Sequence, residues 1–292
     1  MRCLFGLLIP AVVMMLAAEG AAARSAAGAH STGISLNDST ADSLDDFRSR
    51  FLLDMPSTVR IRVAAVSLPG SSVNSPTAYG ADFRDVFAIA VYQDRTRYAD
   101  RPDGAAAVGL GLGDSRKAVG LEFAFTNYNV FTEADRDETR DVSVSAKVHR
   151  QVTDNLSLAV GVENGVALRG EIGDSGTSYY GVATRNFRLR SNLQRPFSML
   201  TASAGIGNGR FRSERQIVDG DERLNVFGSL GIQVVRALGV VADWTGQDLN
   251  AGLSIAPLKR VPFIITAAYA DVTGRAGDGA RLVIGVGYGY SF

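Results

Sequence analysis

The residues that could do chemistry are charged or imidazole side chains within short segments of alternating apolar and polar or small residues. They are Asp94, Glu122, Lys147, His149, Glu163, Arg185, Asp243 and Arg281. Successive side chains of a strand point to opposite faces, so these residues would share one face of their strands. We interpret that face as the lining of a barrel. There the charges either form a polar pathway of mixed charge or pair with one another and fill the interior.

Two of these charges have a defined expected partner. Glu122 and Lys147 fall at similar depth on neighbouring segments, and we predict that they form an ion pair. His149 could act as a base for Ser143 or Ser145 on the same face. Lipid hydrolysis requires a site that reaches the lipid-facing surface, whereas the alternation directs His149 inward. We therefore expect no enzyme, with an outer-membrane lipid hydrolase as the weakest alternative.

Metal and cofactor chemistry is not expected either. His149 is the only histidine of the alternating region, and Cys3 is the only cysteine of the chain. Together they cannot build a multi-histidine or thiolate metal site. Glycines at every second position, as in Gly109-x-Gly111-x-Gly113, are followed by another alternating segment rather than by the helix of a dinucleotide-binding loop. We interpret these glycines as small residues on the interior face.

The elements that must position these residues are twelve alternating segments of about ten residues, the pattern that is typical of a transmembrane barrel. They lie near 85–97, 105–113, 117–129, 140–152, 156–166, 177–189, 197–211, 223–235, 238–247, 248–258, 262–272 and 280–292. In the last segment Leu282, Ile284 and Val286 alternate with Gly285 and Gly287. The predicted fold is all-β, a closed antiparallel transmembrane barrel of about 12 strands.

The connections between the segments alternate in length. They are tight near 114–116 and 153–155 and long near 131–139 and 209–222, and the short connection near 246–248 is an exception. Outer-membrane barrels have short periplasmic turns and longer external loops, so we expect both termini in the periplasm. Arginines in the long connection near 209–222 could contact lipopolysaccharide phosphates.

The N-terminal third has a different character. The predicted parts of the chain are a secretory signal peptide (1–23), a flexible periplasmic or plug segment (24–84) and the barrel (85–292). Arg60 and Arg62 stand within residues 57–66, which alternate weakly. Three alternatives stay open for 57–66: a plug that meets the interior acids, a periplasmic tail, or an extra strand.

The final strand, from Arg281, resembles the C-terminal strand of the bacterial outer-membrane β-barrel superfamily, over about residues 85–292. The resemblance implies that the barrel-assembly machinery reads Tyr288, Tyr290 and Phe292. It also implies a bacterial outer-membrane location, with lipid and lipopolysaccharide as partners. The stretch Asp243–Asn250 resembles one in uncharacterised cyanobacterial-type barrel proteins and implies no activity.

The expected function is a narrow channel for passive passage of small hydrophilic solutes. The alternative is a structural or surface-interaction barrel with a filled lumen. Strand number does not decide between them, because barrels of about eight strands are filled and those of about sixteen hold an aqueous channel. An aromatic girdle at the membrane interface would consist of Trp244, Tyr269, Tyr288, Tyr290 and Phe292. The 30 Lys+Arg against 30 Asp+Glu exclude the basic footprint of a nucleic-acid-binding protein.

Overall fold

The structure is a computed structural model that describes residues 68–292 except 98–99, 129, 131–141, 170–175, 193, 260 and 278. The predicted signal peptide and residues 57–66 lie outside the described residues. The strands are β1 (Asp85–Gln93), β2 (Asp103–Gly113), β3 (Gly120–Asn127), β4 (Val142–Thr153), β5 (Leu156–Arg169), β6 (Ser178–Arg188), β7 (Met199–Gly207), β8 (Asn225–Val235), β9 (Leu238–Trp244), β10 (Leu249–Ile255), β11 (Phe263–Ala270) and β12 (Arg281–Ser291). Between β7 and β8 lie a 3-10 turn, η1 (Gly209–Phe211), and a short helix, α3 (Glu214–Val218).

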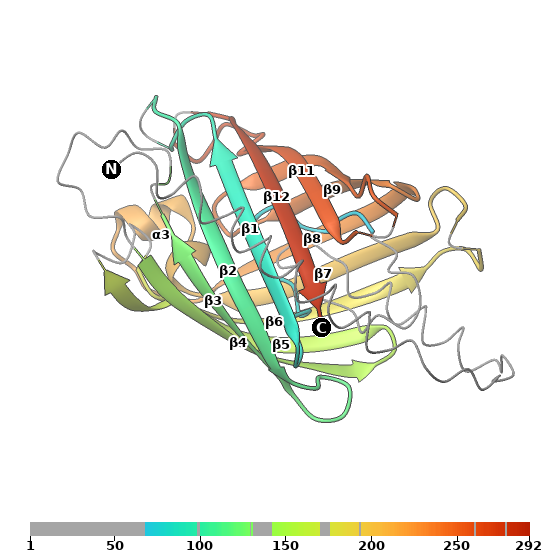
Figure 1. The fold of residues 1–292 in the computed structure, drawn as a ribbon. Coiled ribbons are helices and arrows are strands. Elements are labelled where there is room, and N and C mark those ends of the chain that lie inside the picture. Colours follow the sequence, from blue (N-terminus) through green and yellow to red (C-terminus); the bar gives the residue numbers. More distant parts are fainter. Residues whose placement is uncertain are drawn as a thin grey trace, which may run out of the picture. The chain divides into compact units, whose positions relative to one another are not determined.

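These strands form one closed antiparallel barrel, which confirms the predicted fold class (Figure 1). Each strand pairs with its sequence neighbours, and β1 pairs with β12 from Asp85–Ser291 to Gln93–Val283. Closure leaves no sheet edge with unpaired backbone groups, which is the condition for crossing a bilayer with strands. Among the described residues, no helix has the length and apolar character needed to cross a membrane.

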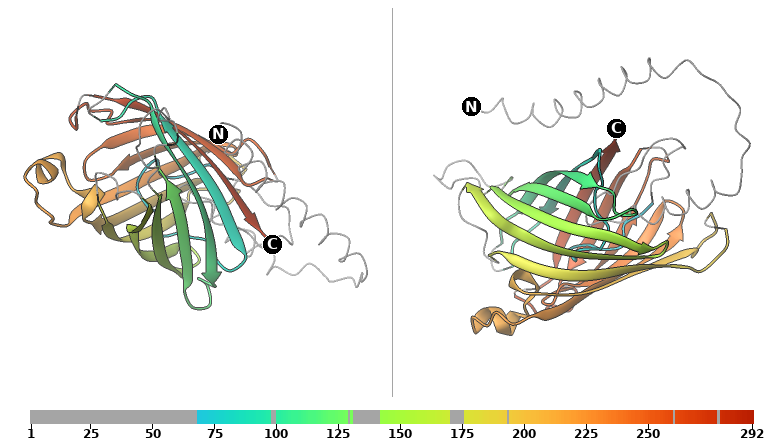
Figure 2. Two further views of the ribbon diagram at one scale, coloured as in Figure 1. Left: turned by 60° about the vertical axis from the view of Figure 1, so that its left-hand side comes forward. Right: turned by 90° about the horizontal axis from the view of Figure 1, so that it is seen from below.

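The two ends of the barrel differ in their connections (Figure 2). The long-loop end carries residues 94–102, 128–141, 170–177, 208–224, 245–248 and 271–280, and the short-turn end carries 114–119, 154–155, 189–198, 236–237 and 256–262. The predicted alternation of long and short connections therefore holds with two exceptions. Connection 245–248 is short although it lies at the long-loop end, and connection 189–198 is longer than the others at the short-turn end. β1 begins and β12 ends at the short-turn end, as an even number of antiparallel strands requires.

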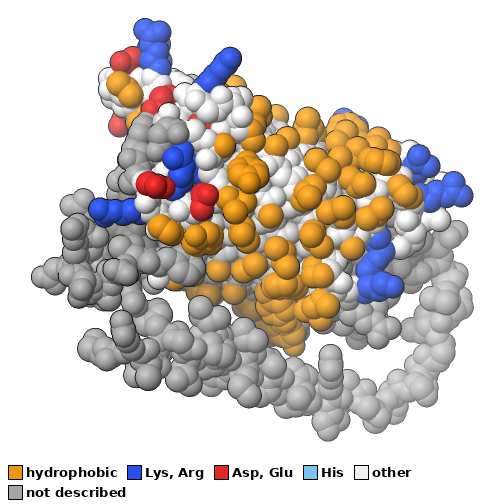
Figure 3. Space-filling view, turned by 90° about the horizontal axis from the view of Figure 1, so that it is seen from above, with side chains coloured by type: hydrophobic (Ala, Val, Ile, Leu, Met, Phe, Trp, Pro, Cys, Tyr) orange, Lys and Arg blue, Asp and Glu red, His pale blue; other side chains and the backbone are white. Residues whose placement is uncertain are grey.

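Side chains on the two faces of the wall differ in polarity, as the alternation predicts. On β3, Leu121 and Phe125 are exposed on the outer face, whereas Glu122 and Ala124 are buried inside. Apolar side chains such as Val160, Tyr179 and Val226 are exposed on the outer face, and on the side that it views Figure 3 shows hydrophobic side chains in a broad band with charged groups toward the ends of the band. The polar residues are inside and the apolar residues outside, the reverse of a water-soluble protein.

A segment before β1 fills much of the interior. Residues 68–84, called the plug segment below, are mostly buried and hydrogen-bond to inward-facing side chains. The segment starts at the short-turn end beside Gly239, reaches Asp243 near the end of β9, and returns to Ser115 at the short-turn end. In Figure 1 it is the blue trace within the ring of strands. The plug segment is therefore a loop that enters and leaves by one end.

Glycines of the wall make room for the plug segment. A Cβ at Gly111 would lie 2.2 Å from the carbonyl carbon of Ala81, and one at Gly231 would lie 2.5 Å from Cα of Ser71. Any side chain there would collide with plug backbone. This close approach explains why glycine is required at these two positions of the inner face.

The connection between β7 and β8 folds back onto the barrel. The sequence predicts strand up to residue 211, but β7 ends at Gly207. Phe211 instead turns inward and is fully buried, with its ring stacked on Phe227 at 4.4 Å between centroids and set against Tyr180 at 5.9 Å. This aromatic cluster positions Arg210, the preceding residue, at the long-loop end of the interior.

Candidate functional site

The top of the plug segment is held by one buried carboxylate. Asp243 Oδ2 accepts hydrogen bonds from the backbone N–H groups of Val73, Asn74 and Ser75 at 3.1, 2.7 and 2.7 Å. Asp243 Oδ1 accepts one from Asn250 Nδ2 at 2.8 Å. Successive N–H groups that converge on one oxygen form an anion-binding concavity, here occupied by the protein's own side chain. Asp243, 2% exposed, is thereby fully supplied with donors.

The descending limb of the plug segment meets a second set of wall residues. Ala81 N donates to Glu122 Oε2 at 2.6 Å, and Lys147 Nζ donates to the Tyr79 carbonyl at 2.9 Å. Glu122 and Lys147 are direct cross-strand neighbours, and Lys147 Nζ lies 3.2 Å from Glu122 Oε1. The predicted ion pair is confirmed, and its two members also bind the plug backbone.

The lower end of the plug segment contains the histidine. His149 Nε2 lies 3.0 Å from the Ala81 carbonyl oxygen and 3.8 Å from Asp82 Oδ1. Asp82 also accepts hydrogen bonds from the backbone and hydroxyl of Ser115, both at 2.9 Å. The two serines proposed as nucleophiles contact a different residue, Asn164. The contacts of His149 are therefore those of a residue that fastens the plug.

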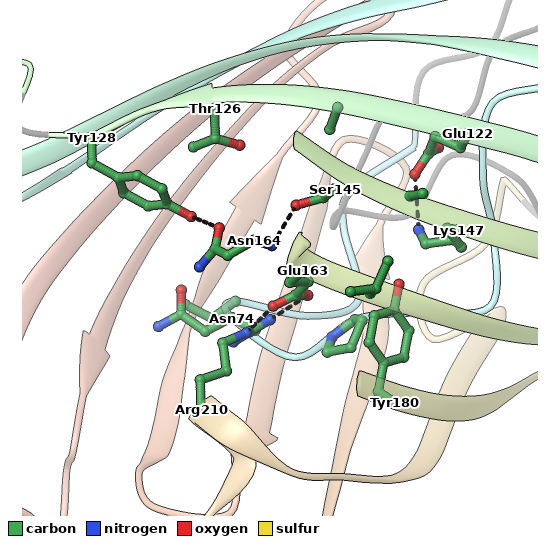
Figure 4. A pocket seen from close by; sticks show the side chains of 15 residues that line it. Asn74, Glu122, Thr126, Tyr128, Ser145, Lys147, Glu163, Asn164, Tyr180 and Arg210 are labelled. Atoms are coloured by element: carbon green, nitrogen blue, oxygen red, sulfur yellow. Dashed lines mark hydrogen bonds and ion pairs between the residues drawn. The ribbon is translucent and has the colours of Figure 1, made fainter. Parts of the chain in front are cut away.

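A cavity of about 330 Å³ lies above these contacts, between the plug segment and β3–β6 (Figure 4). Its charged lining consists of Glu122 with Lys147 and Glu163 with Arg210. Arg210 forms a bidentate pair with Glu163, with Nη2 2.9 Å from Oε1, and also donates to the Asn74 carbonyl at 2.9 Å. Arg210 thus joins the barrel wall to the top of the plug segment.

A bulge in β5 brings one more polar group into the cavity. Val144 and Ala146 of β4 pair with Val166 and Val162 of β5, so β5 carries two extra residues there. Asn164 lies in this bulge with a φ of 54° and turns inward. It accepts hydrogen bonds from Tyr128 OH at 2.7 Å and Ser143 Oγ at 2.8 Å and donates its N–H to Ser145 Oγ at 3.1 Å.

The tyrosine of this network is a neutral donor. Tyr128 follows β3, and burial, together with the nearby Glu163 carboxylate, raises the pKa of its phenol. Its hydroxyl therefore keeps its proton well above neutral pH and donates to Asn164 (Figure 4).

Arg281 belongs to a separate ion-pair cluster at the long-loop end. Arg281 Nη2 lies 2.7 Å from Asp248 Oδ2, and Arg97 donates to both oxygens of the same carboxylate at 2.6 and 2.9 Å. These contacts tie the 94–102 connection to the 245–248 connection and to the start of β12. The cluster restrains the rim and does not line the cavity.

Two residues predicted for the lumen lie elsewhere. Arg185 is exposed on the outer face of β6, with its guanidinium 5.1 Å from the centre of the Phe187 ring. The inward residues of β6 are its even-numbered ones, such as Thr184, so the prediction for Arg185 is wrong by one position. Asp94 lies after β1, exposed, and accepts a hydrogen bond from Leu282 N at 2.9 Å. The other predicted lumen residues, Glu122, Lys147, His149, Glu163, Asp243 and Arg281, are inside or at the rim.

Several residues of the interior were not predicted. They are Asp82, Asn164, Arg210 and Asp248. Asp82 and Arg210 lie outside the strands, where alternation gives no direction, and Asn164 faces inward only because of the bulge. The predicted aromatic girdle residues are on the outer face: Trp244 is 40% and Tyr269 is 55% exposed, and Tyr288 and Tyr290 are half-buried.

The arrangement offers hydrogen-bond donors and acceptors. In the part of the chain that the structure describes, no group of three or more His, Cys, Asp or Glu residues could hold a metal ion. No protein-family model matches the chain, and no curated protein matches it either. The fold and the site therefore define it as a closed twelve-stranded barrel with an internal plug and a polar cavity.

Proposed function

We propose that the protein is a bacterial outer-membrane barrel that its own plug segment keeps closed, with the cavity facing the outside of the cell. The observation that carries this proposal is the reversed polarity of the wall. Val160, Tyr179 and Val226 are each more than half exposed, whereas Glu122 and Asp243 are almost fully buried. Soluble monomers rarely expose apolar surface beyond a few hundred Å² in one patch, and lipid would cover this one.

The orientation follows from the connections. In outer-membrane barrels the longer connections face outward and the short turns face the periplasm. The cavity opens among residues near the long-loop end, such as Tyr128 and Arg210, and both ends of the plug segment lie at the short-turn end. Lipid and lipopolysaccharide would surround the wall, and the assembly machinery would read the strand that contains Tyr288 and Tyr290.

The filled interior favours a closed barrel over the narrow channel that was expected from the sequence. The plug segment is bound at its top by Asp243, along its descending limb by Glu122 and Lys147, and at its base by Ser115. Plug backbone fills the space in front of Gly111 and Gly231 on the inner face of the wall.

A channel is the second candidate, in a state without the plug in place. The observation in its favour is how the plug segment is attached. Its described contacts with the wall are mainly single hydrogen bonds to side chains, and its only described bridge is Phe83 with Gly111. Such contacts can be released one by one without breaking the barrel ladder. The wall then exposed would carry both signs of charge, as a channel for small hydrophilic solutes would.

Two measurements test the proposal. Single cysteines at Gly220, in the long 208–224 connection, and at Asn155, in a short turn, are labelled on intact cells with a membrane-impermeant maleimide. We expect label at residue 220 alone, and label at residue 155 alone would contradict the orientation. In planar bilayers we expect the wild-type chain to insert without steady conductance. Steady ohmic conductance of the wild type would contradict the closed state and support the channel.

A further inference from the structure

We infer that the 330 Å³ cavity between the plug segment and β3–β6 is a binding site for a small, uncharged, hydroxyl-rich molecule such as a monosaccharide or a linear polyol. This inference goes beyond the proposed function, because it assigns a ligand class to a cavity and does not depend on which membrane surrounds the barrel. Three properties of the cavity support this ligand class: its size, the balance of its charges and the hydrogen-bonding groups of its wall.

The size sets the first bound. Ligand pockets in proteins are usually about 300–1,000 Å³, so this cavity falls at the small end of that range. It admits one small molecule and excludes a peptide or an oligosaccharide. The lining combines polar groups with the ring of Tyr180 and the aliphatic surface of Val162, and this mixture suits a compact ligand with both C–H and O–H groups.

The charges exclude an ionic ligand. The charged lining residues are two acids and two bases, and each acid is paired with a base: Glu122 with Lys147, and Glu163 with Arg210. A ligand with net charge would add an uncompensated charge to a site whose charged side chains already balance. A zwitterion would have to separate one of the pairs, and both pairs also hold the plug segment through Ala81 N and the Asn74 carbonyl.

The carboxylate of Glu122 is already engaged by the protein. Its Oε2 accepts a hydrogen bond from Ala81 N, and its Oε1 is buried 3.2 Å from the Lys147 ammonium. Glu122 and Lys147 both line the cavity (Figure 4), so a neutral ligand would lie beside an ion pair that is already complete.

Hydroxyl groups on the wall complete the match. Thr126 and Ser145 present hydroxyls at the cavity, and Tyr128 adds a third (Figure 4). Each hydroxyl of a ligand can both donate and accept a hydrogen bond, so it can pair with either an acceptor or a hydroxyl of the cavity wall. An apolar ligand would offer no partner to the Thr126 hydroxyl, and such a loss is a main source of discrimination at polar sites.

The test is binding of named probes to the full chain in micelles of a detergent without a sugar headgroup. Glucose, galactose and mannitol are the neutral probes, glycine is the zwitterion and inorganic phosphate is the anion. Saturation-transfer NMR detects contact, and calorimetry gives affinity. We expect saturable millimolar or tighter binding of at least one neutral probe. No neutral probe bound, or stronger binding of glycine or phosphate, would overturn the inference.

Variants place the binding in this cavity. Thr126→Val removes one wall hydroxyl at constant shape and should weaken binding about 3- to 10-fold. Ser145→Phe fills the cavity and should abolish binding. The matched control is Thr266→Val, a buried inward threonine of β11 outside the cavity lining, and it should bind as the wild type does. Heat-modifiable gel migration checks that each variant is folded, and binding unchanged in folded Thr126→Val and Ser145→Phe would overturn the inference.

The outcome is separable from that of the proposed function. A wild-type chain that is silent in bilayers and binds no neutral probe contradicts only the cavity assignment. A chain that binds a neutral probe and conducts steadily contradicts only the closed barrel.

Discussion

Two buried carboxylates of the interior, Asp243 and Glu122, are each 2% exposed, and each binds plug backbone, yet their surroundings differ. Asp243 accepts hydrogen bonds from three backbone N–H groups, the Ser72 hydroxyl and the Asn250 amide, and it has no base among these partners. Glu122 receives one backbone N–H, lies beside the Lys147 ammonium and keeps one oxygen without a hydrogen bond in the described structure.

The difference separates an acid held by uncharged donors from an acid held by a base. Asp243 accepts hydrogen bonds from the plug backbone and from neutral side chains, so it holds the chain in place. Glu122 is paired with Lys147 and lines the cavity, so its replacement should affect both the plug segment and the cavity. Charge and burial alone, which are the same at both sites, would not distinguish them.

Removal of Asp243 should have the largest effect. Asp243→Ala leaves the N–H groups of Val73, Asn74 and Ser75 buried without an acceptor, which should lower the free energy of unfolding by at least about 3 kcal/mol or release the plug segment. Bilayer recordings should show new conductance, and thermal unfolding in detergent should show a lower Tm. Asp243→Asn keeps an acceptor oxygen and should lose less. A silent Asp243→Ala with wild-type Tm would contradict the structural assignment.

A clash with the plug segment should have the next largest effect. Gly231→Val places a side chain where Cβ is 2.5 Å from Ser71 Cα, and overpacking of this kind costs about 1–3 kcal/mol. The control is Gly181→Val on β6, where the nearest contact of a Cβ is 3.9 Å. Thermal melts of the two variants in the same detergent should differ, with only Gly231→Val destabilised. Equal melts would show that plug backbone does not press on this wall.

Neutralisation of Glu122 should mainly affect the cavity. In Glu122→Gln the amide oxygen can still accept from Ala81 N, but the amide nitrogen then faces the Lys147 ammonium. We expect a loss of about 1–2 kcal/mol in unfolding free energy and weaker binding of neutral probes. In a double-mutant cycle with Lys147→Met, the combined loss should be smaller than the sum of the single losses. Additive losses would mean that the two groups do not interact.

Replacement of the partly exposed Asp114 should have the smallest effect on stability. Partial burial opposes ionisation of Asp114, but hydrogen bonds from the backbone of Lys117 and Arg116 outweigh it and hold the pKa of Asp114 below its usual value. Its stabilising effect is therefore present above the unfolded pKa of about 4 and lost as the pH falls through the lower folded pKa. Asp114→Asn should change stability at neutral pH by at most about 0.5 kcal/mol. Urea midpoints at pH 7 and pH 3 measure both values, and a large loss at pH 7 would contradict this ranking.

The strands were predictable because burial on one side leaves a period of two in the sequence. That period also predicted the Glu122–Lys147 ion pair, because two inward charges at equal depth on neighbouring antiparallel strands lie side by side. It failed at Arg185, where the alternation of β6 is weak and the outward set includes Gly181 and Ala183. A one-residue error in register sends a side chain to the opposite face.

The plug segment was not predictable in the same way. Residues 68–84 contain Pro, Gly, Ser and Asn without a period, and most of their bonds to the wall come from backbone groups that any sequence supplies. The signal that could have indicated it lies in the wall instead. Asp243 is an acid on the inner face, and glycines such as Gly111 and Gly231 recur at inward positions. Glycines on the inner face leave room for another stretch of backbone, and isolated acids there can accept hydrogen bonds from its N–H groups.

Amide hydrogen exchange of the plug segment tests the central claim most directly. In the folded full chain, the amides of Val73, Asn74, Ser75, Ala78 and Ala81 should exchange as slowly as those of the barrel strands, because each donates to a buried wall acceptor. Exchange of these five amides as fast as in the exposed connection at residues 219–223 would show that the plug segment is not bound inside the barrel.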